Sequence, residues 1–186
     1  MSFQERLDAL KPLLERRDTA TAISAYHNLP YAIFHYDPVD EWELRKALRL
    51  LAHHLEGHNK KVEFVSLADC LNGALEAPDL DVDKLAEAEV NAGDEALIDT
   101  LNHVLSNETP LDELVAARVP ADADLVFMVR AGALFPFYRT SALLERMMGQ
   151  VKTPCILFFP GRFYSPAGLG FMGVLEPEHN YRARIY

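Results

Sequence analysis

The chain has 186 residues, of which 49% are hydrophobic and 25% are charged, and its formal net charge is −10. These proportions are those of a globular protein and exclude a collagen-like or an intrinsically disordered chain. The acidic balance also disfavours direct nucleic-acid binding, because that affinity rests largely on neutralising phosphates. The length fits one domain, so we expect residues 1–186 to fold as a single unit.

The charge is unevenly distributed along the chain. Residues 1–120 hold 11 Lys and Arg against 23 Asp and Glu, whereas residues 121–186 hold 7 against 5. The C-terminal third is therefore mildly basic, and it is where an acidic partner surface would be favoured.

The cysteine usage and the N-terminus indicate the compartment. Cys70 and Cys155 both lie in apolar runs, which favours a reduced intracellular protein over a disulfide scaffold. The N-terminus enters an amphipathic pattern directly, without the basic and apolar regions of a signal peptide. No apolar run approaches the roughly 18 residues of a membrane span, so we expect a cytoplasmic protein with no membrane partner.

Strand and helix patterns alternate along the chain. Apolar residues recur at helical spacing over residues 3–14. Buried strands are predicted at residues 31–36 (YAIFHY), 62–67 (VEFVSL), 124–131 (DLVFMVRA) and 154–162 (PCILFFPGR). Strands separated by helices predict an α/β fold, here a Rossmann-like open sheet that is mostly parallel.

The first crossover helix has clear ends. Asp37 is predicted to cap it, with Pro38 at its first position and Gly57 at its C-terminal end. Asp69 is likewise placed to begin the short helix after the second strand. The apolar face of the first crossover helix is expected to contain Trp42, Leu44, Leu48, Leu51 and Leu55.

The remaining segments complete the expected architecture. From about residue 78 to 120 the pattern is helical and rich in Asp and Glu, which predicts an acidic, solvated helical insertion. Another helix is expected over residues 140–148. Residues 181–186 (YRARIY) alternate strictly, so we expect a C-terminal edge strand, antiparallel to the others.

One motif resembles a dinucleotide-binding sequence. Residues 168–173 (GLGFMG) match G-x-G-x-x-G, but no helix pattern and no acidic residue at the required distance follow them. We therefore expect a glycine-rich turn or hairpin there, and no cofactor.

Residues that follow each predicted strand are candidates for a ligand site, because parallel strands end at one edge of the sheet. Asp37, Asp69, Arg130 and Gly132 occupy such positions, and two carboxylates beside an arginine could hold Mg²⁺ and a phosphate. Helix capping explains both aspartates equally well. No complete catalytic set is present, so no catalytic residue is assigned.

Histidines give a weak case for a metal. His54 and His58 are four residues apart, a spacing that can bind zinc on a helix. Gly57 falls between them, however, and no carboxylate or cysteine follows at a matching spacing, so no metal site is assigned.

Aromatic residues and arginines gather in the C-terminal third. Phe135, Phe137 and Tyr138 precede Arg139 at the start of a helix, where a cation opposes the helix dipole. Arg162, Phe163 and Tyr164 repeat the pattern at the neighbouring strand end. Aromatic residues and arginine are enriched in interface hot spots, so these seven residues form a candidate partner-binding surface, with core packing as the alternative for the aromatics.

The same residues carry a resemblance to a known family. The stretch GALFPFYR at residues 132–139, FFPGRFY at residues 158–164, GFM at residues 170–172 and the closing Tyr181-Arg182 resemble BrxB of bacterial BREX phage-defence systems, a domain of unknown function. The resemblance is sharpest over residues 124–186. It implies a cytoplasmic protein encoded beside an AAA+ ATPase, a DNA methyltransferase and the phosphatase-like protein PglZ, and it brings no established catalytic residues.

Two functions follow as hypotheses. The first is a non-enzymatic adaptor or assembly subunit of a BREX-type complex, which docks a PglZ-like protein or other BREX components. The alternative is a metal-dependent phosphoesterase or nucleotide-binding enzyme that uses Asp37 and Asp69. Whether those two carboxylates converge at one sheet edge separates the hypotheses.

Overall fold

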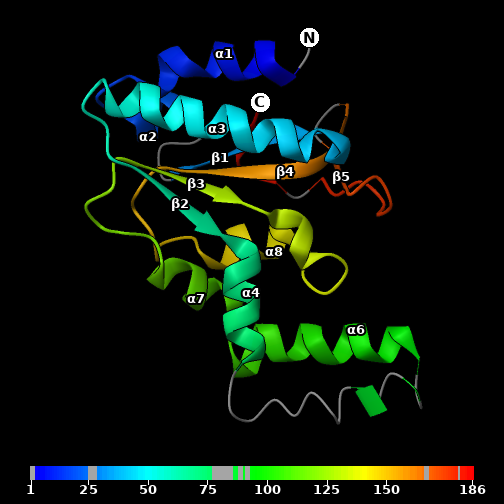
Figure 1. The fold of residues 1–186 in the computed structure, drawn as a ribbon. Coiled ribbons are helices and arrows are strands. Elements are labelled where there is room, and N and C mark those ends of the chain that lie inside the picture. Colours follow the sequence, from blue (N-terminus) through cyan, green and yellow to red (C-terminus); the bar gives the residue numbers. More distant parts are fainter. Residues whose placement is uncertain are drawn as a thin grey trace.

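The structure is a computed structural model that describes residues 3–24, 29–76, 86–87, 90, 93–165, 168–179 and 181–186. Within these residues, helices pack on both faces of a mostly parallel sheet (Figure 1). The predicted open α/β sheet is confirmed.

The sheet has the strand order β2-β3-β4-β1-β6, and β5 lies off this path and pairs with β4. The strands β2, β3, β4 and β1 run parallel, with Val62 opposite Leu125 and Tyr31 opposite Cys155. Strands of this kind are buried on both faces, which is why they occur as continuous apolar runs in the sequence. Their bounds are β1 Tyr31–Tyr36, β2 Val62–Ser66, β3 Leu125–Val129, β4 Cys155–Tyr164, β5 Gly168–Phe171 and β6 Arg184–Ile185.

The helices divide the core into two layers. On one face of the sheet lie α1 (Phe3–Leu14), α2 (Thr19–Ile23) and α3 (Glu41–Glu56), and on the other lie α4 (Leu67–Leu75), α7 (Leu111–Ala117) and α8 (Thr140–Arg146) (Figure 1). Neighbouring strand residues alternate between the two layers. Phe34 and Phe158 pack against α1 and α3, whereas Ile33 and Leu157 pack against α4 and α8.

Helix α3 is entered through a short 3-10 helix, η1 (Pro38–Asp40). The Asp37 side chain accepts a hydrogen bond from the Val39 amide at 3.2 Å, so Asp37 is a cap with Pro38 after it as predicted, but it caps η1, and α3 itself begins only at Glu41. Trp42 does not join the apolar face as expected, and its side chain is 64% exposed. It lies two residues before Leu44, a separation that places two side chains on different faces of a helix.

The second predicted cap is wrong. Helix α4 follows β2 without a loop, and Ser66 is its N-cap: the Asp69 amide donates to the Ser66 hydroxyl at 3.3 Å. Asp69 therefore lies inside the first turn, and its carboxylate pairs with Arg130 at 3.1 Å.

The described part of the predicted insertion at about 78–120 is mostly helical. Helix α6 (Asp94–His103) continues into a π-helical turn, η2 (Val104–Glu108), and α7 follows. Residues 77–85, 88–89 and 91–92 of this range lie outside the described residues. Figure 1 shows α6 beyond the far end of α4, away from the sheet. Helix α7, by contrast, belongs to the core, because Leu111 and Val115 are fully buried.

The C-terminal strand is an edge strand, but its predicted antiparallel direction is wrong. Strand β6 pairs with β1 in parallel, with Ala32 opposite Arg184. The preceding segment runs back along α8, where the Tyr181 hydroxyl and the Thr140 hydroxyl are hydrogen-bonded at 2.9 Å. Burial raises the pKa of Tyr181 to about 12. This return brings residues 181–183 beside the start of β1, and from there β6 runs in the same direction as β1.

Candidate functional site

The carboxyl ends of the parallel strands form one rim of the sheet. The chain leaves β1 toward α3 on one face and leaves β3 toward α8 on the other, so the crevice between them is a topological switch point. A cavity of about 250 Å³ lies there. Its lining includes Glu41 and Arg45 from α3, Arg130 and Gly132 after β3, and Pro160 of β4.

Arginine–carboxylate pairs follow this rim. Arg162 pairs with Asp37 at 3.4 Å, and Arg130 pairs with Asp69 at 3.1 Å. Within the cavity, Arg45 pairs with Glu41 at 2.7 Å. The pairs are partly exposed, so each contributes less than about 1 kcal/mol and can exchange its partner readily.

The strand order keeps the two candidate metal-binding aspartates apart. Asp37 follows β1 and Asp69 follows β2, and these strands are separated by β4 and β3. Three inter-strand steps correspond to about 14 Å, which is too far for one metal ion. Neither aspartate belongs to a group of possible metal ligands among the residues that the structure describes. Of the alternative site, Asp69 pairs with Arg130, and Arg130 shares the cavity wall with Gly132, whereas Asp37 pairs with Arg162 instead.

Arg139 has an acidic partner within its own chain. It precedes α8 with extended backbone angles, and its guanidinium pairs with Glu178 at 2.7 Å. The Ser141 hydroxyl donates to the other oxygen of the Glu178 carboxylate at 2.5 Å. The unfavourable position of this arginine at a helix N-terminus is therefore explained by Glu178, although the guanidinium itself stays exposed.

The predicted aromatic surface divides into a buried and an exposed part. Tyr138 is 2% exposed and belongs to the core. Phe135 and Phe137 are partly buried against the same core, and the Phe135 ring lies 6.0 Å from the Phe171 ring. Core packing, the alternative to partner binding, therefore explains these three aromatic side chains.

The other candidate residues lie on a hairpin that extends beyond the rim. The last four residues of β4, from Gly161, leave the parallel sheet and pair antiparallel with β5. This hairpin carries Phe163 and Tyr164, which are 41% and 44% exposed, next to exposed Arg162. The segment GLGFMG supplies β5 and the turn after it, so the expected hairpin is present in place of a phosphate-binding loop.

His35 joins the base of this hairpin to α1. The Arg6 guanidinium donates to His35 Nε2 at 2.8 Å and to the His35 carbonyl at 2.8 Å, and the imidazole stacks on Phe163 at 6.0 Å. Because arginine can only donate, the imidazole is neutral with its proton on Nδ1. Burial, together with the neighbouring Arg6 charge, lowers the pKa of His35 to about 4.

Two further apolar side chains near the rim were not predicted as surface residues. Val39 in η1 is exposed, and so is Trp42 in the first turn of α3. Both lie just after Asp37, whose carboxylate reaches Arg162 on the hairpin. Trp42 breaks the helical spacing of the apolar residues, and this break could have indicated from the sequence that its side chain is exposed. Tryptophan is among the residues that contribute most at protein interfaces.

The fold and rim define an open-sheet α/β protein with a charged, partly aromatic surface at the carboxyl ends of its strands. None of the described helices is long and apolar enough to cross a membrane. The family model of BREX protein BrxB matches residues 63–185, about two thirds of the chain. The chain therefore belongs to the BrxB family.

Individual relatives agree with this assignment. The chain is 24% identical to BREX protein BrxB of Bacillus cereus (strain H3081.97) over 97% of its own length and 95% of the relative. It is 27% identical to BREX protein BrxB of Escherichia coli O9:H4 (strain HS), covering 84% of this chain and 78% of the relative. No solved structure gives a significant match.

Proposed function

We propose that this BrxB-family chain is a non-enzymatic adaptor or assembly subunit of a BREX-type phage-defence complex. It docks a larger partner, such as a PglZ-like phosphatase-fold protein, through the rim at the carboxyl ends of the strands. The docking surface consists of the exposed side chains Arg139, Arg162, Phe163, Tyr164 and Trp42.

The observation that carries this proposal is the exposure of Phe163 and Tyr164 on a hairpin that reaches beyond the sheet. Aromatic side chains beside an arginine are typical of interface hot spots, because they bury a large area at little cost in conformational entropy. The Arg162–Asp37 pair is exposed, so an acidic group of a partner can replace Asp37 with little loss of stability.

The geometry gives less support to an enzyme built on Asp37 and Asp69. That hypothesis requires both carboxylates at one metal ion, and the strand order places them three strands apart. Each carboxylate already pairs with a different arginine, Asp37 with Arg162 and Asp69 with Arg130. We therefore take the adaptor function as the conclusion.

Affinity purification of the tagged full chain from its native host tests this function. The informative variant combines Arg162→Glu with Tyr164→Ala, since both side chains are exposed on the hairpin. Arg139 is left unchanged, because reversing its charge would place a second carboxylate against the largely buried Glu178 carboxylate. The matched control combines Arg17→Glu with Leu50→Ser, which changes one exposed arginine and one exposed apolar residue elsewhere.

We expect the hairpin variant to lose its PglZ-like partner and to lose phage restriction, while its melting temperature stays within about 2 °C of the wild type. The control variant should keep both. Charge reversal within a buried contact costs several kcal/mol, so the loss of binding should be complete at cellular concentrations. Retention of the partner by the folded hairpin variant would place the docking surface elsewhere.

A further inference from the structure

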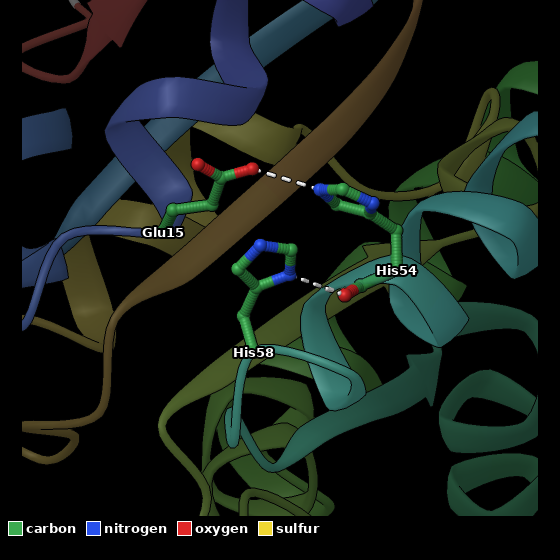
Figure 2. A group of neighbouring side chains, drawn as sticks. All are labelled: Glu15, His54 and His58. Carbon is green, nitrogen blue, oxygen red and sulfur yellow. Dashed lines mark hydrogen bonds and ion pairs between the residues drawn. The ribbon is translucent and has the colours of Figure 1, made fainter.

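Three side chains meet where the C-terminal ends of α1 and α3 lie, at the end of this helix layer away from the hairpin (Figure 1). Glu15 follows the end of α1, His54 lies in the last turn of α3, and His58 lies just beyond Gly57 (Figure 2). One ligand atom from each lies within 4.8 Å of the others. His54 Nε2 is 2.8 Å from Glu15 Oε1, and the two imidazole centres are 4.5 Å apart.

The hydrogen bonds of the cluster fix which ring nitrogens are free. His58 Nδ1 is 2.9 Å from the His54 carbonyl oxygen, which can only accept, so Nδ1 carries the proton. The neutral ring then has its lone pair on Nε2, on the side that faces Glu15 and His54 (Figure 2). A hydrogen bond from the non-coordinating nitrogen to a backbone carbonyl is the usual support of a histidine that binds a metal.

The Glu15–His54 contact presents a carboxylate and a second imidazole to the same point. The His54 Nε2–H donates to the Glu15 carboxylate, so both groups point at the position that a metal ion would take. The His54 Nε2 proton lies between the two groups. A metal ion that enters there takes the Nε2 lone pair and the carboxylate oxygen as ligands once the ring proton has moved to Nδ1, so that the bound ring is the neutral imidazole.

We propose that Glu15, His54 and His58 form a binding site for a divalent transition metal ion, with Zn²⁺ as the best match. Two imidazoles and one carboxylate are a common zinc ligand set, with water in the fourth position. Calcium and magnesium prefer oxygen ligands alone, which this cluster does not offer. The bound ion connects the end of α1 to the end of α3 and so stabilises the packing of these two helices on the sheet.

Neighbouring contacts hold the site in place without a metal. The Lys60 ammonium donates to the Arg16 carbonyl at 2.5 Å and to the Thr19 hydroxyl at 3.0 Å, which fixes the segment after α1 against the segment after α3. The Glu15 amide donates to the Lys11 carbonyl at 3.1 Å and continues the helical hydrogen bonding of α1. The backbone segments that carry Glu15 and His58 are therefore held side by side before a metal ion binds.

The neighbouring His53 provides a matched control. It is 89% exposed, and its ring faces Glu56 at 3.8 Å on the surface of α3. The experiment is calorimetric titration of the chelator-treated full chain with ZnCl₂, with thermal unfolding and Co²⁺ absorption spectra as further measurements. The variants are His58→Gln, Glu15→Gln and His53→Gln.

We expect the wild type and His53→Gln to bind one Zn²⁺, to melt at a higher temperature with Zn²⁺, and to give a four-coordinate Co²⁺ spectrum. His58→Gln and Glu15→Gln should each weaken Zn²⁺ binding at least about 10-fold and lose the gain in melting temperature. Absence of binding to the wild type, or equal binding by all variants, overturns the proposal.

NMR spectroscopy of the wild type keeps the test decisive if a variant fails to fold. Zn²⁺ should shift the imidazole signals of His54 and His58 and leave those of the other five histidines unchanged. Shifts confined to other histidines contradict the proposal. The metal site does not depend on the adaptor function, because its ligands lie outside the docking surface.

Discussion

Replacement of Gly161 by alanine should open the hairpin that carries the docking surface. Gly161 opposes Phe171 at the point where β4 leaves the parallel sheet and pairs with β5. A Cβ atom at this position would lie 2.1 Å from the Gly170 carbonyl oxygen and 2.5 Å from the Phe159 ring. Neither neighbour can move easily, since the first is backbone and the second is fully buried.

The expected cost follows from this overlap. Overpacking a rigid site destabilises a protein by about 1–3 kcal/mol, and the double overlap at Gly161 places this substitution at the upper end. For a chain of this length, about 3 kcal/mol lowers the melting temperature by about 6–12 °C. Gly132→Ala is the matched control, because its Cβ would meet Met172 Sδ at 3.4 Å and Pro160 Cγ at 3.7 Å, which are ordinary contacts.

Thermal unfolding followed by circular dichroism measures both variants. Gly132→Ala should melt within about 2 °C of the wild type, and Gly161→Ala should melt well below it and also lose its partner. If Gly161→Ala has the same melting temperature as the wild type, β4 and β5 do not approach as closely as described. The proposal that a rigid hairpin presents Phe163 and Tyr164 would then be wrong as well.

Two further predictions concern a histidine and a helix cap. The pKa of His35 in the folded chain is about 4, below its ordinary value of 6.5, so protonation favours the unfolded chain. The free energy of unfolding should therefore be highest above about pH 6.5 and fall toward pH 4. The expected loss is about 1–2 kcal/mol after allowance for the partly exposed ring. Urea unfolding of His35→Gln, which keeps an acceptor for Arg6, should show a smaller loss over this range, and an identical loss in both proteins would contradict the neutral imidazole. Ser66→Ala should cost about 1 kcal/mol as the true cap of α4, whereas Asp69→Ala should cost less, since it removes only an exposed pair. The reverse order in urea unfolding would show that Asp69 is the cap.

The strands and the helix ends could be predicted where the signal is local. The runs around Ile33 and Leu157 are buried on both faces, so their apolar character is continuous in the sequence. Asp37 before Pro38 predicted a cap that the structure contains. Asp69 was misassigned because Ser66, three residues earlier, is an equally good cap and the sequence does not say where β2 ends.

Contacts between distant segments could not be predicted in this way. The carboxylate of Glu15 lies 39 residues before His54, so the spacing of His54 and His58 gave no sign of a third ligand. Glu178 follows Arg139 by 39 residues, and their ion pair explains an arginine whose position at a helix N-terminus is unfavourable by sequence alone. The separation of Asp37 from Asp69 depended on strand order, which local pattern does not encode.

The sequence by itself determined the α/β class, the four central strands and the aromatic, basic character of the C-terminal third, because burial and helical or strand periodicity act between near neighbours. Tertiary structure alone decided the direction of β6, the exposure of Phe163 and Tyr164, and the partner of each rim arginine. Those features depend on which segments the folded chain brings side by side, and the free energy of such contacts is set by packing and charge across the fold.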